Sequence, residues 1–300
     1  MTEVRHISVL PEEILHWIQP RPGQIIVDGT LGGGGHTRAL AALVEPDGFI
    51  LALDRDPRAL AVAETNLSGL AVKLAQANFC ELPQVLREIS TPLVDAILLD
   101  LGLSSDQLAD EERGFSFDSD GPLDLRFDPE SGEPASRLVE RLSEQNLADL
   151  IYTYGEERYS RRIAKAIVER RRERPIETAN DLANIVRRAI PRSRHEDRID
   201  AATRTFQALR IAVNEELKSL ETALRLMPDL LKPNGRLAII SFHSLEDRRV
   251  KEAFRSDLRL NNLTKKPIVA GEAEVSRNAR SRSAKLRVAQ RVNDAGVTTN

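Results

Sequence analysis

A run of glycines directly after a short apolar segment constrains this chain more than any other feature. Residues 24–28 (QIIVD) have the composition of a buried strand, GTLGGGGH follows at 29–36, and TRALAALV at 37–44 has a helical pattern. Glycines between a strand and a helix let the backbone turn tightly and approach a ligand, and the helix start offers free N–H groups. The sequence therefore predicts a βα unit with a ligand at its turn.

The same alternation of strand and helix patterns continues along the chain. A helix is expected at 57–67, where Pro57 occupies a helix start. Further strands are expected at 49–54, 72–77, 95–100 and 236–242, with a final edge strand at 286–292. Strands separated by helices of this length indicate βαβ units. The fold class is therefore α/β, with a doubly wound, Rossmann-like parallel sheet.

A long helical block interrupts this pattern after the fourth strand. Residues 104–134 have no sustained period and are expected to form a long loop, whereas 136–231 are almost wholly helical in pattern. Within the block, Ser143 and Thr178 are expected to cap the starts of helices, Gly155 to be a C-cap, and 156–174 to form a basic helix. We expect one domain from 1–105 and 215–292, an inserted substrate-recognition domain at 106–214, and a disordered tail at 293–300.

Composition and charge limit the classes of protein to which this chain can belong. No window has the roughly 18 apolar residues that a membrane span needs, and Cys80 is the only cysteine, so a cytoplasmic protein is expected. The formal net charge is −3, but from Arg158 to Arg210 fifteen basic residues face seven acidic ones, and residues 276–291 carry six basic residues and no acidic one. This asymmetry is compatible with a polyanionic partner, and equally with solvated helix faces.

The glycine spacing distinguishes between two classes of nucleotide cofactor. A dinucleotide fingerprint needs G-x-G-x-x-G, but here Gly32 and Gly34 lead to Thr37. An aspartate at the strand end with glycines four and six residues later (Asp28, Gly32, Gly34) is instead typical of enzymes that bind S-adenosylmethionine.

Polar residues end the neighbouring strands as well. Asp54 follows Gly32 by 22 residues and can accept hydrogen bonds from both ribose hydroxyls, Phe79 follows the third strand, and Asp100 closes the fourth. The carboxyl ends of these strands meet at the point where strand order reverses, which is where ligands bind in open α/β sheets.

At this point the chain resembles one family over nearly its whole length. The motifs HISVLPEEIL, DGTLGGGGH, LLDLGLSSDQL, RGFSF, DGPLDLRFD, FQALRIAVNEEL, RLAIISFHSLEDRRVK and SRSAKLRVAQR extend from about His6 to Val292. Together they resemble the bacterial 16S ribosomal RNA cytosine-N4-methyltransferases, the RsmH family, formerly MraW. The resemblance implies a class I methyltransferase that methylates the exocyclic amine of a P-site cytidine in the small subunit.

The resemblance also implies site residues and partners. It implies S-adenosylmethionine contacts at Gly34, Gly35, His36, Asp54, Phe79, Asp100 and Gln107, and no metal is expected. The expected partner is 16S rRNA or the 30S subunit, and a homodimer is left open. For catalysis, the place of Asp100 makes it a candidate acceptor for the cytosine amine, with binding of the cofactor alone as the equal alternative. His243, after the fifth strand, is a second candidate.

Basic residues and aromatics are candidates for RNA contact. The helical spacing of Arg158, Arg161, Arg162 and Lys165 and the C-terminal group Arg280, Arg282, Lys285 and Arg287 would neutralise phosphates. Phe115 and Phe117 are candidate stacking partners for a flipped base. The rival readings are a methyltransferase for another RNA, a protein or a small molecule, an NAD(P)-dependent oxidoreductase, and a non-catalytic RNA-binding assembly factor.

Overall fold

The computed structural model describes residues 7–117, 120–191 and 200–293. The chain forms two compact units, one from the residues up to Ser105 together with those from Leu217 onward, and one from Asp106–Glu216. Of the tail predicted to be disordered, 293–300, all residues after Asn293 lie outside the described residues. None of the described helices combines the length and the apolar character that crossing a bilayer requires.

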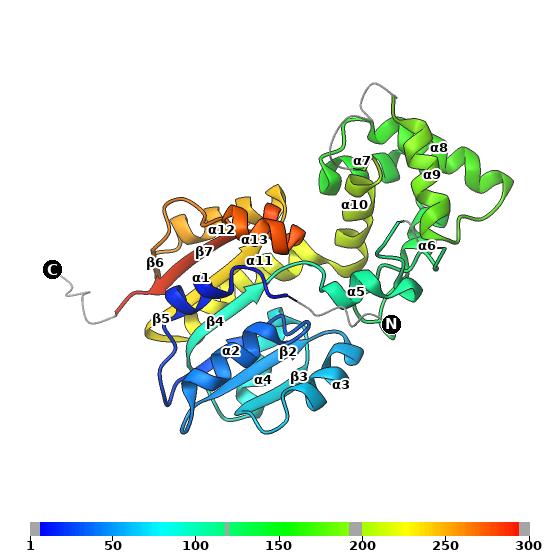
Figure 1. The fold of residues 1–300 in the computed structure, drawn as a ribbon. Helices are drawn as coiled ribbons and strands as arrows, with labels where there is room; N and C mark the ends of the chain where they lie inside the picture. Colours follow the sequence, from blue (N-terminus) through cyan, green and yellow to red (C-terminus); the bar gives the residue numbers. More distant parts are fainter. Residues whose placement is uncertain (1–6, 118–119, 192–199, 294–300) are drawn as a thin grey trace. The chain divides into compact units, whose positions relative to one another are not determined.

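The first unit is built on a seven-stranded sheet in the order β3-β2-β1-β4-β5-β7-β6 (Figure 1). The strands are β1 (Ile25–Asp28), β2 (Phe49–Asp54), β3 (Val72–Gln76), β4 (Val94–Asp100), β5 (Leu231–Ser241), β6 (Leu260–Asn262) and β7 (Lys285–Arg291). Strands β1 to β5 are parallel, and β7 runs antiparallel to both β5 and β6. The doubly wound α/β fold is thus confirmed, with its order reversing between β1 and β4. The expectation that the last strand forms an edge is wrong, because β6 covers β7.

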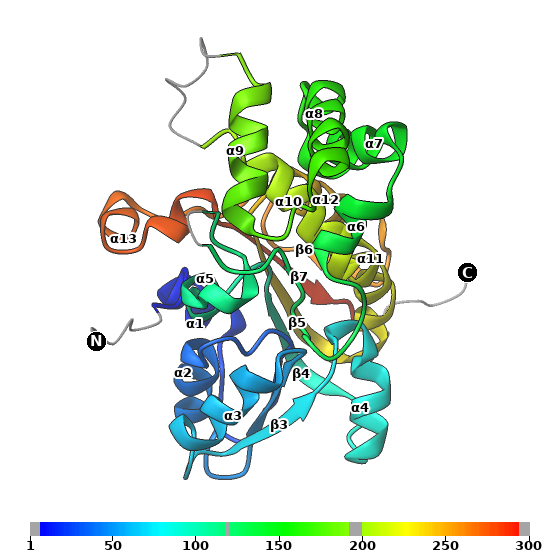
Figure 2. The same cartoon turned by 90° about the vertical axis from the view of Figure 1, so that its right-hand side faces the viewer.

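Helices cover both faces of this sheet (Figure 2). They are α1 (Pro11–Ile18), α2 (Gly35–Val44), α3 (Pro57–Asn66), α4 (Leu82–Glu88), α11 (Glu216–Leu226), α12 (Ser244–Ser256) and α13 (Glu272–Arg277), with the short turns η1 (Phe79–Glu81), η4 (Met227–Leu230) and η5 (Ala279–Ser283). Helices α1, α2 and α3 contribute to one apolar cluster, and α4, α11 and α12 to the other. The sheet is therefore the middle of three layers.

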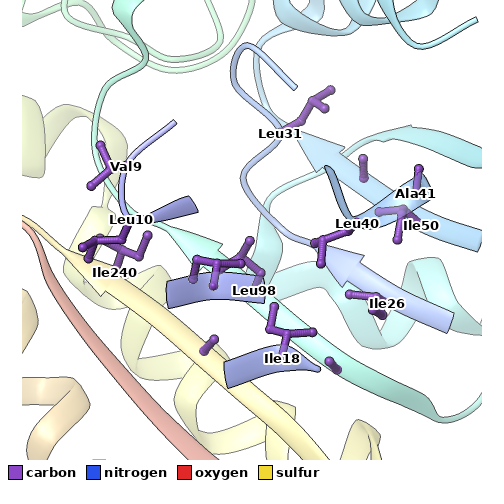
Figure 3. Packing of buried hydrophobic residues seen from close by; sticks show 14 of the residues in the cluster. Val9, Leu10, Ile18, Ile26, Leu31, Leu40, Ala41, Ile50, Leu98 and Ile240 are labelled. Carbon is purple, nitrogen blue, oxygen red and sulfur yellow. The ribbon is translucent and has the colours of Figure 1, made fainter. Parts of the chain in front are cut away.

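Strand β4 shows how the sequence builds these layers. Ala96 and Leu98 belong to the cluster under α1, α2 and α3, whereas Ile97 and Leu99 belong to the opposite cluster. Successive side chains of a strand point to opposite faces, so a central strand must be apolar throughout. Figure 3 shows Leu98 with Ile26 and Ile240 in the first cluster. The rigid sheet that results fixes the positions of the polar residues at its strand ends.

The second unit is helical. Among its described residues, two short helices follow β4 and five longer ones form the body, in which α7 packs against α8 and α10, and α8 against α9. The elements are α5 (Ser105–Ala109), η2 (Glu111–Arg113), α6 (Ala135–Arg141), α7 (Glu144–Gly155), α8 (Ser160–Glu173), α9 (Ala179–Ala189) and α10 (Thr203–Asn214).

The helix ends predicted for the helical unit are confirmed at two residues and wrong at two others. Ser143 and Thr178 cap α7 and α9 as predicted. Gly155 does not cap α7: Glu156 adopts the left-handed C-cap conformation instead. A Cβ on Gly155 would lie 2.5 Å from the Arg204 carbonyl oxygen, so this glycine permits the close approach of α10. The basic helix begins at Ser160, four residues later than predicted.

Candidate active site

Three aspartates end three adjacent strands of the first unit. Asp28, Asp54 and Asp100 are the last residues of β1, β2 and β4, which lie side by side in the order β2-β1-β4. Because these strands are parallel, their carboxyl ends lie at the same edge of the sheet. The structure thus brings these sequence-predicted residues together, and their surroundings differ.

Asp28 organises the turn that follows it. Its side chain is 1% exposed, and it accepts hydrogen bonds from the Thr37 hydroxyl at 2.7 Å and from the Thr30 backbone N–H at 3.2 Å. Burial raises its pKa to about 6, against the opposing effect of these hydrogen bonds. Both carboxylate oxygens thus bind the chain's own loop and helix, so Asp28 acts by holding the glycine turn in shape.

The glycine turn needs glycine for two different reasons. Gly32 and Gly34 have φ values of 49° and 75°, in the left-handed region, and Gly34 is the N-cap of α2. Gly29 is restricted by space instead, because a Cβ there would lie 2.5 Å from the Leu99 side chain. Helix α2 then begins at Gly35, so the free backbone N–H groups of its first turn lie next to the glycine turn. Gly29 was not among the residues predicted from the sequence.

Asp54 holds the other side of the turn. Its Oδ2 accepts from the Gly32 N–H at 2.8 Å and its Oδ1 from the Asp56 N–H at 2.9 Å. Burial raises the pKa of Asp54, and these two N–H groups act against the rise. The Arg55 N–H acts in the same direction. A carboxylate has about four lone-pair sites, so these three backbone donors leave capacity for a hydroxyl donor on a ligand.

Asp100 differs from Asp28 and Asp54 in the hydrogen bonding of its carboxylate. Its backbone N–H donates to the Thr30 hydroxyl at 2.6 Å, which ties the end of β4 to the glycine turn. Its Oδ2 lies 3.8 Å from Nε2 of His36, while its buried Oδ1 has no hydrogen-bond partner among the described residues. Burial raises the pKa of Asp100 to about 7; Arg280 opposes the rise, and Asp28 and Glu246 add to it. A buried carboxylate oxygen without a donor is costly, so this atom is suited to a donor on a ligand.

The other predicted residues have distinct surroundings. Phe79 is half-buried in η1 and packs against the apolar cluster beneath the sheet, 3.2 Å from where a Cβ on Gly29 would lie. His243 is the N-cap of α12: its Nδ1 accepts from the Glu246 N–H at 3.4 Å. Capping accounts for His243, and its direct role in the reaction stays a prediction. Gln107 lies on α5 in the other unit, so its place at the cofactor also stays a prediction.

The two groups of basic residues predicted to contact RNA differ in their exposure. Arg161, Arg162 and Lys165 are exposed along α8, with Lys165 3.8 Å from Glu169, and Arg158 is exposed beside Tyr159. In the C-terminal group Arg282 is exposed and Lys285 lies 3.5 Å from Asp247. Arg287 is only 4% exposed and donates to Asp247 at 2.7 Å, which removes it from the proposed RNA-binding surface.

The two aromatic candidates differ in burial. Phe115 is 5% exposed and stacks on Phe127, whereas Phe117 is half-buried and its ring packs edge-on to Phe206. Burial gives Phe115 the role of a core residue, and stacking of Phe117 on a base stays a prediction. Sequence reasoning in turn missed Thr30 and Thr37, whose only signal is their place two and nine residues after Asp28.

Comparisons with known proteins identify the family of the chain. The model of the MraW methylase family matches residues 3–292. A protein of Geobacter sp. strain M21 is 49% identical over 97% of this chain and all of its own length, and one of Rhodopirellula baltica is 51% identical over 97% of this chain and 92% of its own. Both are named ribosomal RNA small subunit methyltransferase H.

Solved structures are more distant. An rRNA methylase from Streptococcus thermophilus is 12% identical with a TM-score of 0.45, covering 94% of each chain. A SAM-dependent O-methyltransferase from Thermotoga maritima is also 12% identical, with a TM-score of 0.43, and covers 97% of this chain and 69% of its own. TM-scores below 0.5 carry no argument about function.

Proposed function

The chain belongs to the MraW methylase family, and on this premise we propose that it methylates the exocyclic N4 amine of a P-site cytidine, cytosine 1402, in 16S rRNA. As a member of this family it is an S-adenosylmethionine-dependent methyltransferase of small-subunit ribosomal RNA. The observation that carries the finer proposal is the buried Oδ1 of Asp100, which has no donor among the described residues. We propose the cytoplasm as the site of action.

The residues at the strand ends fit the cofactor. Asp54 retains capacity for a ribose hydroxyl, the turn from Gly32 to Gly34 would bring backbone close to the ligand, and Phe79 would offer an apolar surface after β3. When bound, S-adenosylmethionine supplies an electrophilic methyl group on a sulfonium. Asp28 contributes indirectly, by holding the turn through Thr30 and Thr37.

The chain's own task is to prepare the amine. The lone pair of a cytosine N4 amine is delocalised into the ring, so the amine is a weak nucleophile. In this proposal the Asp100 carboxylate accepts an N–H of the amine, which strengthens the lone pair and provides for the departing proton. Asp100 must be ionised to do so, and since its pKa is raised to about 7, activity should increase as pH rises through neutrality.

The helical unit is proposed to bind RNA. Arg161, Arg162 and Lys165 are exposed along α8 and Arg158 is exposed just before it, so these four residues could neutralise phosphates. Arg282 and Lys285 of the first unit are separate candidates for phosphate contact. A homodimer remains a separate prediction that nothing in this proposal requires.

The test is methyl transfer from tritiated S-adenosylmethionine to 30S subunits that come from a strain lacking the protein, followed by mass spectrometry of 16S fragments. The proposal expects one methyl group on N4 of the P-site cytidine with the wild-type chain and a loss with Asp100→Asn. Exposed Asp47→Asn is the matched control. Methylation of another nucleotide, or of protein only, would contradict the proposed target, and no incorporation at all would favour an assembly factor.

A further inference from the structure

One arginine near the C-terminus contacts the loop that follows the proposed catalytic strand. Arg280 lies in η5; its Nη1 donates to the Ser105 hydroxyl at 3.1 Å and its Nη2 to the Leu103 carbonyl oxygen. Its guanidinium also lies over the ring of Phe242, 5.8 Å from the centroid. We propose that Arg280 is a positioning residue for methyl transfer, which fixes the loop after Asp100 and supplies a positive charge to that carboxylate. This inference rests on the proposed function.

The loop needs an external anchor because it leaves the sheet abruptly. The last sheet-like hydrogen bond is from the Leu101 N–H to the Ile240 carbonyl oxygen, at 3.0 Å. Gly102 then turns the chain with a φ of 95°. The next residues lie beside the cofactor turn, since a Cβ added to Gly32 would lie 3.5 Å from the Cβ of Ser104. Arg280 binds the residues on both sides of Ser104, and so its contacts hold the loop against the glycine turn.

Arg280 is itself held in place. Its backbone N–H donates to Oδ1 of Asn278 at 3.2 Å, and Nδ2 of Asn278 donates to the Ile7 carbonyl oxygen at 3.1 Å. The neighbouring Ser281 is 1% exposed and donates to the Asn278 carbonyl oxygen at 2.8 Å. A guanidinium on a fixed backbone loses little further freedom when it forms several hydrogen bonds in one plane. These contacts distinguish Arg280 from Arg282, which is exposed two residues later and remains a candidate for phosphate.

The charge of Arg280 matters because Asp28 and Glu246, which also act on Asp100, are acidic and disfavour its ionised form. Burial raises the pKa of Asp100 most; Asp28 and Glu246 raise it further, and Nε2 of His36 is 3.8 Å away. Arg280 is the cation that opposes this rise. Loss of its charge should therefore raise the pKa of Asp100 above about 7 and reduce the ionised fraction at neutral pH.

The test is the pH profile of kcat/KM for methylation of 30S subunits by Arg280→Gln. The rising limb should move up by on the order of one pH unit, which is roughly a fivefold loss at pH 7, close to tenfold at lower pH, and is regained in alkali. Arg280→Lys should restore the limb, and exposed Arg87→Gln on α4 is the matched control. A pH limb that does not move would overturn the proposal. A rise in KM alone, together with a smaller dependence of KM on salt concentration, would overturn it in favour of a contact between Arg280 and an RNA phosphate. Inactivity of the wild-type chain would instead defeat the proposed function.

A second readout needs neither substrate nor cofactor. Amide hydrogen exchange of residues 101–105 should be faster in Arg280→Gln than in the wild type, and unchanged in Arg87→Gln.

If Arg280→Gln does not fold, the variant Ser105→Ala tests the positioning role, because it removes one hydrogen bond of Arg280 and keeps the charge. It should lower kcat roughly two- to fivefold and leave the pH limb in place; an unchanged kcat would contradict the positioning role.

Discussion

The strand ends of the first unit and the exposed side of α8 in the second use charge in opposite ways. At the strand ends, Asp28 is 1% exposed and Asp100 has a buried oxygen without a donor among the described residues. On α8, Arg161 and Arg162 are exposed to water. A buried charge lowers stability unless the protein or a ligand pairs it, whereas solvated charges cost almost nothing. The first region, through Asp100, is therefore expected to exchange stability for activity, while the side chains of α8 should act additively and depend on salt.

The largest effect should come from removing the buried negative charge. Asp100→Asn has the shape of the wild type but is a poor proton acceptor, so turnover on 30S subunits should fall roughly 100-fold or more. Single-turnover methylation at saturating cofactor measures this, and calorimetry of S-adenosylhomocysteine separates the two roles. Equal losses of cofactor affinity and rate would assign Asp100 to cofactor binding, and full turnover would exclude it from both roles.

A buried charge with a partner should behave differently from one without. Arg287 and Asp247 form such a pair within the first unit. Burial alone would raise the pKa of Asp247, but Arg287 and Lys285 hold it below its ordinary value. Arg287→Met should destabilise the unit by about 2 kcal/mol above pH 4, because it leaves the half-exposed Lys285 as the remaining cation beside the carboxylate, and this loss should shrink as Asp247 becomes protonated at lower pH. Urea unfolding measures it, with exposed Arg255→Met as the control. An unchanged stability together with weaker RNA binding would return Arg287 to the RNA surface.

The unpartnered Asp100 should show the reverse sign. Because its pKa is raised from 3.8 to about 7 in the folded chain, its contribution to stability is greatest below pH 4 and is lost as pH rises through 7. Asp100→Asn should therefore stabilise the free protein at pH 8, by on the order of 2 kcal/mol, and hardly at pH 4. Fluorescence of Trp17, the one tryptophan of the chain, reports unfolding of this unit. A destabilised variant at pH 8 would remove the proposed conflict between stability and activity.

The smallest effect should be found on α8. Replacing Arg161, Arg162 and Lys165 with Gln should weaken binding of a 16S fragment about tenfold at moderate salt and lower the salt slope by roughly two to three, with little change in stability. Filter binding over a range of salt concentrations measures both. Arg137→Gln on α6, which is exposed and lies 2.8 Å from Glu140, is the control. An unchanged slope would mean that these side chains are an ordinary solvated face.

The sequence predicts the framework of the first region well because local patterns dictate it. Apolar runs bounded by Asp28, Asp54 and Asp100 mark the strand ends, and the parallel order brings them together. A strand as short as β6, three residues long, leaves no such pattern. Nor does sequence spacing separate Arg280 from Arg282, since the contacts of Arg280 with Leu103 and Ser105 join residues more than 170 positions apart.

The most direct test of the whole account is calorimetry of the pure chain with S-adenosylhomocysteine. We expect the wild type to bind it, and Asp54→Asn to bind it about 100-fold more weakly because the charge-assisted hydrogen bonding of the carboxylate to the ribose is lost. NAD should give no heat of binding. Tight binding of NAD, or an Asp54→Asn variant with wild-type affinity for S-adenosylhomocysteine, would contradict the assignment of these strand ends as the cofactor site.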